Sequence, residues 1–335
     1  MFDGPSQAVK VAPKPHIGVV IVTYNSSAVI GACLDSLFGS VGVDMTIVIS
    51  DNRSVDATGN TVKEKVLATS WTYYDSDEDP CTDSFASVGR EVVLLRNREN
   101  GGYGYGVNAG LRFLESIDVV DFYWILNPDC EVLLDTARKF SDSARENPDF
   151  GLIGGRLLYL SDRSTIQTDG GTCGYWTGVC RNLNQGRLLE DEPKVDSNDI
   201  DFIPGASIFV SRAYLSNVGF LREDFFLFYE EVEWCTRDSR LSRLVLPDAI
   251  VFHHGGVSTG SGRPGVSASA FTNYYNFRGR SMYLLQKRPH VFPFAYSYSL
   301  LLIIRMLFRN EFRSAYAAFS GLSLAAPPKF ISKVD

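Results

Sequence analysis

The chain has 335 residues, enough for one large α/β domain or for two domains of ordinary size. Apolar residues make up 45% and charged residues 21%, a balance typical of a soluble globular enzyme rather than a disordered or fibrous chain. The net charge of -7 argues against a general nucleic-acid-binding protein, because binding to phosphates requires a basic surface.

Charge is distributed unevenly along the chain. Residues 276–335 contain nine Lys/Arg and two acids, a net charge of +7, which leaves -14 on the rest. This asymmetry predicts an acidic body with a basic C-terminal region that meets an anionic partner. The six cysteines form no C-x-x-C pair, and we interpret them as reduced thiols of a cytosolic protein. Residues 1–16 lack the apolar core of a secretory signal and are expected to form an N-terminal tail.

The first part of the chain alternates strand and helix patterns. Apolar, β-branched runs typical of buried strands occupy residues 17–23, 45–50, 91–95 and 121–126. Helices are expected around residues 30–37, up to about residue 67, and over 103–114. The polar residues 73–90 predict an exposed loop. Strands that alternate with helices indicate βαβ units and a parallel sheet.

The second part is more mixed. It is expected to hold a strand over 151–160, a glycine-rich segment over 167–182, a loop and strand over 204–212, an acidic aromatic loop that leads into a helix over 222–238, and a strand over 244–252. In open α/β sheets, ligands bind beyond the carboxyl ends of the strands. The polar groups TYN, DNRS, NGGYG and NPD all follow predicted strands, so we expect them to converge on one site.

Seven segments carry a resemblance to a known family. The chain resembles the family 2 glycosyltransferases, particularly their bacterial rhamnosyltransferase-like branch. The matching segments, in the order in which the family has them, are VVIVTYN (19–25), SDNRSVDAT (50–58), RNRENGGYGYGVNAG (96–110), LNPD (126–129), PGASIFVSR (204–212), FFLFYEEVEWCTR (225–237) and HHGGVSTG (253–260). They cover roughly residues 17 to 285, and the ordered set is far more specific than any one member.

The resemblance implies the fold and the domain organisation. The expected fold is α/β, the nucleotide-sugar-binding GT-A domain with a mostly parallel central sheet, followed by a C-terminal helical extension. The GT-A domain would span residues 17–275, with a nucleotide-binding half over 17–130 and an acceptor-binding half over 131–275. Residues 276–335 would form the basic amphipathic helical region. Members of the family invert the anomeric centre with the help of a divalent cation.

The donor-binding residues are expected at the strand ends. Tyr24 offers a stacking surface, and Asp51 can accept a hydrogen bond from a pyrimidine N3–H, although a helix cap is an alternative role for Asp51. The glycines after residue 100 let the backbone approach a diphosphate at a helix N-terminus. The full predicted set comprises Thr23, Tyr24, Asn25, Asp51, Asn52, Ser54, Asn100, Gly101, Gly102, Tyr103, Asn108 and Asn127.

Asn127-Pro128-Asp129 stops an apolar strand abruptly and has two interpretations. All three residues favour turns, so a simple turn is one. The other is a metal site: transfer from a nucleotide sugar expels a nucleoside diphosphate, and a carboxylate-held Mg²⁺ or Mn²⁺ neutralises that leaving group. The resembling branch has the same NPD sequence at this position, and its histidine before G-x-S corresponds to His253. A structural histidine is the alternative for His253.

The catalytic carboxylate is expected in YEEVEWCTR. The family usually has Glu-Asp-x-Asp here, with the general base at the position of Glu231. Glutamate at both aspartate positions keeps the carboxylate but adds a methylene, which lengthens the reach by about 1.5 Å. A solvated acidic helix start is the alternative. The acceptor side is expected to include Gly205, Ala206, Glu230 and Glu233, although GFLREDFF lacks the family's usual Asp-Glu pair.

The C-terminal region has a pattern of its own. Residues 292–304 are uncharged, but this run of about 13 residues is shorter than the roughly 20 that span a bilayer. Arg305, Arg309 and Arg313 recur every four residues beside apolar side chains, which favours an amphipathic helix on an anionic membrane surface. Docking against the protein's own core or in a homo-oligomer is the alternative.

Together with these patterns, the resemblance implies an inverting, metal-dependent glycosyltransferase on the cytoplasmic face of the cell membrane. It would move a sugar, L-rhamnose from dTDP-L-rhamnose or else the sugar of a UDP-sugar, to a lipid-linked surface polysaccharide. Two other classes stay open. The Glu-for-Asp exchanges allow a non-catalytic glycan-binding or scaffold protein. Gly104, Gly106 and Ala109 match G-x-G-x-x-A, which allows a nucleotide-dependent oxidoreductase, although that fingerprint belongs to the first βα turn.

Overall fold

The computed structural model describes residues 13–77, 89–237, 240–255 and 267–331. Most of the predicted N-terminal tail lies outside the described residues. The same holds for most of the polar segment 73–90, for the GVSTG end of the seventh motif, and for the last four residues of the chain.

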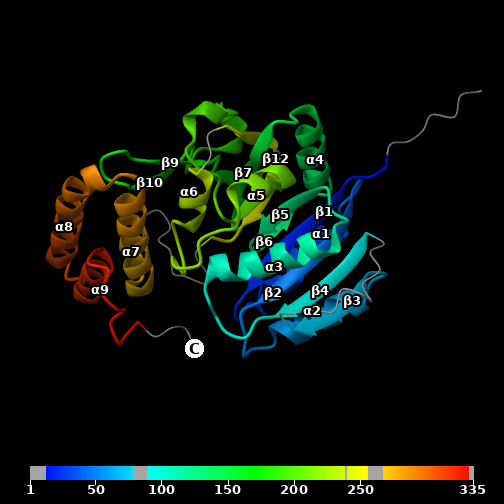
Figure 1. Cartoon of the computed structure of the whole chain (residues 1–335), viewed down its shortest axis with the longest axis horizontal. Helices are drawn as coiled ribbons and strands as arrows, with labels where there is room; N and C mark the ends of the chain where they lie inside the picture. The colour runs from blue at the N-terminus through cyan, green and yellow to red at the C-terminus, as the bar shows by residue number, and fades with distance from the viewer. Residues whose placement is uncertain (1–12, 78–88, 238–239, 256–266, 332–335) are drawn as a thin grey trace, which may run out of the picture.

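One ten-stranded sheet forms the centre of the molecule, in the order β3-β4-β2-β1-β5-β11-β7-β12-β6, with β8 paired to β7 (Figure 1). Its strands are β1 (His16–Thr23), β2 (Asp44–Asp51), β3 (Thr72–Asp77), β4 (Arg90–Arg96), β5 (Phe122–Leu126), β6 (Cys130–Val132), β7 (Phe150–Tyr159), β8 (Asp162–Thr168), β11 (Ser207–Ser211) and β12 (Ser242–His253). A separate hairpin pairs β9 (Gly171–Cys173) with β10 (Cys180–Asn182).

Helices cover both faces of the sheet, as the apolar strands require. On β1, Ile17, Val19 and Ile21 pack against α1 (Ile30–Phe38), α2 (Thr58–Leu67) and α4 (Thr136–Glu146). Val20 and Val22 point to the other face and pack against the side of α3 (Tyr103–Ile117), α5 (Arg212–Val218) and α6 (Glu230–Cys235). Alternation along an extended strand explains why consecutive residues serve the two faces.

The strand directions confirm a mostly parallel sheet. Strands β3, β4, β2, β1 and β5 are parallel to one another, whereas β11 runs antiparallel between β5 and β7. The register places Thr23 beside Asp51 and Asp51 beside Arg96. The carboxyl ends of these strands therefore meet at one edge, and the polar loops that follow them converge there as predicted.

The prediction of a loop over residues 73–90 is wrong for the first residues of this segment. Residues 72–77 form β3, the edge strand, which pairs in parallel with β4. The Arg96 guanidinium makes two hydrogen bonds to the Asp75 carboxylate, at 2.7 and 3.0 Å, which ties the two strands together. A polar edge strand lacks the apolar alternation that identifies a strand, because only one side of it is covered.

Helices after residue 269 form a layer at one end of the molecule: α7 (Ala270–Lys287), α8 (Phe292–Phe308) and α9 (Phe312–Leu322), with α8 outermost (Figure 1). The described residues also include the short 3₁₀ helices η2 (Leu189–Asp191), η3 (Ser197–Asp199) and η4 (Pro289–Val291). The predicted boundary between residues 275 and 276 falls inside α7.

Two features of this layer differ from the sequence analysis. Asn310 adopts a positive φ of 59° between α8 and α9, so Arg305, Arg309 and Arg313 do not share one helix. The apolar helical stretch is also longer than predicted: Pro289–Phe308, 20 residues, is long and apolar enough to cross a membrane, and 22% of its apolar stretch is buried. By length and composition it is the single such helix in the described part of the chain.

Candidate active site

A cavity of about 1180 Å³ opens at the carboxyl edge of the sheet. Thirteen of the nineteen predicted site residues line it, namely Tyr24, Asn25, Asn52, Asn100, Gly102, Tyr103, Asn127, Asp129, Gly205, Ala206, Glu230, Glu231 and His253. Thr23, Asp51, Ser54, Gly101, Asn108 and Glu233 do not line it. The cavity therefore gathers the loops after β1, β2, β4 and β5, together with the start of α6.

Asp51 links the end of β1 to the loop after β2 through hydrogen bonds. Its Oδ1 accepts hydrogen bonds from the hydroxyls of Thr23 (2.8 Å) and Ser54 (2.5 Å), and its Oδ2 accepts one from the Ser54 backbone N–H (3.0 Å). Only 4% of Asp51 is exposed. Asn25 adds a second link, because its side-chain oxygen accepts from the Val55 N–H at 2.9 Å. Hydrogen bonding of Asp51 to a nucleobase stays a prediction.

The glycine-rich loop packs against protein rather than standing open. Gly102 has a φ of 95°, and a Cβ there would lie 2.3 Å from the Phe226 carbonyl oxygen. The next N–H, of Tyr103, donates to that same carbonyl at 2.8 Å. Gly104 and Gly106, the glycines of the G-x-G-x-x-A match, lie inside α3 against Arg222 and Val22. These positions explain the glycines by close packing.

Asn108 and Glu233, both predicted site residues, are buried structural contacts. The Asn108 amide donates to the Leu221 carbonyl and to Glu223 Oε1, which ties α3 to the loop before α6. Glu233 forms ion pairs with Arg237 at 2.6 Å and Lys287 at 3.4 Å, the second of which joins α6 to α7. Both side chains support the walls of the cavity from behind.

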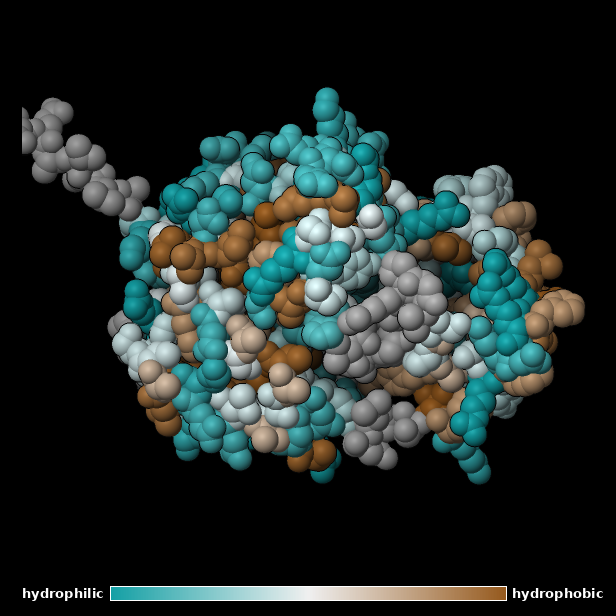
Figure 2. Space-filling model, turned by 180° about the vertical axis from the view of Figure 1, so that it is seen from behind, coloured by the Kyte–Doolittle hydropathy of each residue, from teal (hydrophilic) through white to brown (hydrophobic). Residues whose placement is uncertain are grey.

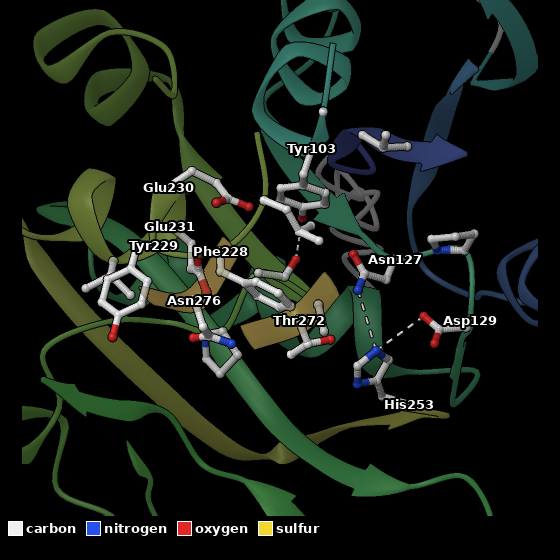
Figure 3. A pocket seen from close by; sticks show the side chains of 18 of the residues that line it. Tyr103, Asn127, Asp129, Phe228, Tyr229, Glu230, Glu231, His253, Thr272 and Asn276 are labelled. Carbon is white, nitrogen blue, oxygen red and sulfur yellow. Dashed lines mark hydrogen bonds and ion pairs between the residues drawn. The ribbon is translucent and has the colours of Figure 1, made fainter. Parts of the chain in front are cut away.

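The side chains of Asp129 and His253 lie next to each other in the wall of the cavity (Figure 3). Asp129 Oδ1 lies 3.2 Å from His253 Nε2. Burial opposes ionisation of Asp129, but the hydrogen bond from His253 prevails and lowers the pKa of the carboxyl below its usual range. Asp129, Cys130 and His253 place one potential ligand atom each within 4.8 Å of the others. The pair thus offers an oxygen and a nitrogen ligand that Mg²⁺ or Mn²⁺ accepts.

Gln167, which the sequence analysis did not single out, orients His253. Its Oε1 lies 2.8 Å from His253 Nδ1, a contact that fixes the imidazole ring with Nε2 directed toward Asp129. Cys130 is a poorer candidate ligand: its thiol donates to the Ala206 carbonyl at 3.5 Å, and burial raises its pKa well above the usual range. The one sequence signal in this region was the glycine-rich composition of residues 167–182, which indicates an unusual backbone conformation and not a functional side chain at Gln167.

A strained loop sets the position of the acidic residues of α6. Phe226, Phe228 and Tyr229 all have φ between 65° and 72°, the left-handed region that non-glycine residues rarely adopt. Packing holds this backbone in place: the Phe226 ring stacks on Tyr275 at 4.9 Å, and the Tyr229 hydroxyl donates to the Gly178 carbonyl at 2.8 Å. Such strain persists at functional sites when the surroundings over-determine it.

Glu230 and Glu231 follow this loop directly and line the cavity opposite Asp129 (Figure 3). Burial raises the pKa of both carboxyls, and the neighbouring Glu231 charge raises that of Glu230 further. The Oε2 atoms of both are buried and have no hydrogen-bond partner among the described residues. Tyr103 lies beside them and donates to the Gly205 carbonyl at 2.5 Å. The arrangement holds two carboxyl groups with free acceptor atoms in a water-poor corner.

The α7 helix also contributes to the cavity. Phe271, Thr272 and Asn276 line it, together with Ala268 just before the helix. The sequence analysis missed Asn276 because it lies in the region predicted to be a separate extension, and it missed the other three because they follow the last matching segment. Aromatic side chains of α7 pack on the loop before α6, so the C-terminal layer completes one wall of the site.

The fold and the site define a GT-A-like α/β protein, a class whose sheet ends in a ligand-binding edge. The family model "Glycosyl transferase family 2" matches residues 18–218, more than half of the chain, and the chain belongs to this family.

Known proteins agree with this class. A mannosyltransferase from Pyrobaculum calidifontis, solved with GDP-Man and Mn²⁺, is 14% identical with a TM-score of 0.55, and the match covers 95% of this chain and 79% of that one. GalNAc-T7, solved with UDP, GalNAc and Mn²⁺, is 11% identical with a TM-score of 0.56, covering 85% and 51%. The low-salt glycan biosynthesis hexosyltransferase Agl10 of Haloferax volcanii is 27% identical over 154 residues, 45% of this chain and 47% of the relative. The match thus spans about half the length of that relative.

Proposed function

We propose that this protein is an inverting glycosyltransferase that uses a divalent cation and a nucleotide-sugar donor. The observation that carries the proposal is a single cavity with Asp129 and His253 on one wall and Glu231 on the facing one. A metal-binding pair suits the leaving diphosphate, and an opposed carboxylate suits the attacking hydroxyl. Family membership supports the same chemistry.

In the proposed reaction, Glu231 acts as the general base. Its carboxylate takes the proton of the acceptor hydroxyl as that oxygen attacks the anomeric carbon, and the bond from this carbon to the diphosphate oxygen breaks. Attack from the face opposite the leaving group inverts the anomeric centre. A retaining double displacement would need a second, nucleophilic carboxylate, and the proposed mechanism assigns none.

Asp129 and His253 fit a divalent cation. Their ligand atoms lie 3.2 Å apart, the pKa of Asp129 is lowered, and Gln167 holds the His253 ring with Nε2 directed toward Asp129. When bound, Mg²⁺ or Mn²⁺ neutralises charge on the leaving nucleoside diphosphate. Two protein ligands are few, but Mg²⁺ commonly relies on phosphates and water for the rest of its shell.

The donor is proposed from the sequence resemblance. dTDP-L-rhamnose is the first candidate and a UDP-sugar the second; the similar structures contain GDP-Man or UDP, so GDP-mannose belongs in the same comparison. We expect dTDP or UDP to raise the melting temperature, and Mn²⁺ to increase that rise, because a ligand that binds only the folded state stabilises it by mass action. A thermal-shift panel measures this. Stabilisation by NAD(H) without metal would instead support an oxidoreductase.

A second prediction concerns Gln167. Replacing it by Leu removes the acceptor that orients His253, and we expect Mn²⁺ affinity to fall by about 10–100-fold, the usual effect of losing such a partner. Titration calorimetry with Mn²⁺ alone measures this without any turnover. Gln185→Leu is the matched control, because Gln185 also lines the cavity but its amide donates to the Tyr159 hydroxyl. Equal affinities for wild type and Gln167→Leu would assign Gln167 to packing.

The acceptor is proposed to be a lipid-linked saccharide of a surface polysaccharide, reached at the cytoplasmic face of the membrane. Support comes from the C-terminal layer, where Arg305, Arg309 and Arg313 are exposed, and from α7, which belongs both to that layer and to the cavity wall. A position on an anionic surface would bring the lipid-linked end of the acceptor close to the site.

A further inference from the structure

The outermost helix has apolar side chains on both of its sides. Ala295, Ser299 and Ile303 form its buried stripe, spaced four residues apart. On the outward side, Leu301 is 63% exposed and Phe308 is 85% exposed. A helix that is apolar all round normally has an apolar partner on every side. The outward residues, here called the outer apolar face, are Phe294, Leu301, Ile304, Leu307 and Phe308.

Figure 2 shows this end of the molecule at the right, where brown and tan residues lie among teal ones. Twenty large apolar side chains are exposed among the described residues, and ten of them fall within residues 289–331. Phe312, Tyr316 and Phe319 of α9 follow a helical spacing of their own. The exposure is therefore concentrated in the C-terminal layer, which marks an interaction surface rather than scattered surface residues.

The tip of the β9–β10 hairpin extends this surface. Tyr175 and Trp176 are 51% and 60% exposed, and the Trp176 ring packs edge-on against Phe294 of α8 at 6.0 Å. The Tyr175 hydroxyl lies 3.0 Å from His290 Nε2, and the Arg288 guanidinium sits 4.7 Å above the Tyr175 ring. Two aromatic rings with polar tips and a basic neighbour are suited to the boundary between water and lipid.

The same hairpin forms part of the catalytic cavity. Cys180, Arg181 and Asn182, the residues of β10, line it. The carbonyl of Gly178, between the tip and β10, accepts the hydrogen bond of Tyr229, which immediately precedes Glu230. The tip that carries Trp176 and the wall that faces the acceptor thus belong to one short segment.

The charge of this surface favours an anionic membrane over a second copy of the chain as its partner. Arg305 and Arg309 are exposed beside the outer apolar face, and Arg288 lies at the hairpin tip. Within residues 289–331, Glu311 is the single acidic residue. In a two-fold dimer the same patch would meet itself, so basic residues would oppose basic residues. An anionic bilayer offers the opposite charge together with an apolar interior.

We propose that Trp176 and Tyr175, together with the outer apolar face of α8, insert into the interfacial region of an anionic membrane. The catalytic cavity then opens beside the lipid surface. The proposal rests on the proposed membrane location of the enzyme. It adds a contact outside the C-terminal region, and it names the side chains that enter the lipid.

Tryptophan fluorescence tests the hairpin contact directly in the full-length protein. The chain has four tryptophans, of which Trp124 and Trp234 are fully buried. With vesicles of phosphatidylcholine and phosphatidylglycerol that carry brominated acyl chains, we expect quenching of the wild type and loss of most of that quenching in Trp176→Phe. Both proteins should still sediment with the vesicles. Trp71→Phe is the control and should keep the quenching. Unchanged quenching in Trp176→Phe would place the hairpin away from the lipid.

A matched pair of variants tests the outer apolar face. Leu301 and Leu67 are both 63% exposed, on α8 and α2 respectively. Leu301→Gln should lower vesicle partitioning about tenfold, the usual consequence of withdrawing one large apolar side chain from an apolar environment, whereas Leu67→Gln should leave it unchanged. High salt should release the wild type, because screening weakens the attraction to the basic residues. Retention in high salt would indicate that α8 spans the bilayer.

A wild type that never sediments with vesicles overturns the proposal. If the protein is then a dimer by analytical ultracentrifugation, and Leu301→Gln makes it monomeric, a second copy covers the face. Neither result bears on the proposed chemistry, because stabilisation by dTDP or UDP is measured without lipid. Loss of nucleotide binding with intact vesicle binding would reject the transferase and leave the membrane surface in place.

Discussion

Replacing Glu231 with Gln is expected to lower turnover by about 10²–10⁴-fold, the usual worth of a positioned general base. Glutamine keeps the size and shape of the side chain but cannot take the acceptor proton. Nucleotide binding should persist, because Asp129 and His253, which are proposed to hold the diphosphate through a cation, lie on the facing wall of the cavity. Steady-state kinetics with the preferred donor, and dTDP or UDP affinity measured in parallel, separate the two effects.

The pH profile gives this prediction a second readout. Burial raises the pKa of Glu231, and the base works only when deprotonated. The pH profile of kcat/KM should therefore have an acidic limb, along which kcat/KM rises with pH, and the pKa of this limb should lie above the usual carboxylate range. Glu231→Asp restores the residue of the resembling family but shortens the arm. It should keep an acidic limb, whereas Glu231→Gln should lose it.

Controls come from the two neighbouring glutamates. Glu230→Gln removes a buried carboxyl whose own pKa is raised by burial and by Glu231, and it should leave the acidic limb of Glu231 in place, because burial raises the Glu231 pKa. Glu233→Gln breaks ion pairs to Arg237 and Lys287 and should lower the melting temperature more than kcat of the folded enzyme. A larger loss of turnover in Glu230→Gln than in Glu231→Gln would reassign the base. No loss in any of the three would favour a non-catalytic glycan-binding protein.

Asp129→Ala is expected to abolish metal-dependent turnover. Losing the carboxylate removes the anionic ligand of the proposed cation, and the transition state should lose several kcal/mol of stabilisation, about 10²-fold or more in rate. The fold should survive, since Asp129 follows the buried strand β5 and its backbone carbonyl still accepts from the His254 N–H at 3.1 Å. Mn²⁺ titrations of the rate, together with the melting temperature, measure both outcomes.

Asp129→Asn separates charge from shape at this position. The amide can keep a hydrogen bond to His253 but carries no charge, so it should be almost as inactive as alanine. The exposed Asp118 provides a control, because Asp118→Asn removes a carboxylate that pairs with Arg212 far from the cavity, and it should leave metal dependence unchanged. Full activity of Asp129→Asn at ordinary Mn²⁺ concentrations would return Asn127-Pro128-Asp129 to the turn interpretation.

The sequence by itself determined the alternating architecture and the edge of the sheet on which the site lies. Runs such as residues 17–22 carry no polar side chain, and a strand covered on both faces buries them. Parallel strands then place all their carboxyl ends together, so the loops carrying Tyr24, Asn100 and Asp129 had to converge. This part of the prediction depends on local pattern and simple geometry.

Only the tertiary structure decided which polar groups face the cavity. Asp51 and Asp129 both lie at the end of a strand. The carboxylate of Asp51 accepts three hydrogen bonds from Thr23 and Ser54. The carboxylate of Asp129 instead contacts His253, which lies on a strand 124 residues further along the chain. Gln167, Thr272 and the hairpin tip at Trp176 reach their places through packing of distant segments. Orientation and burial of a side chain depend on neighbours remote in sequence, which local periodicity does not record.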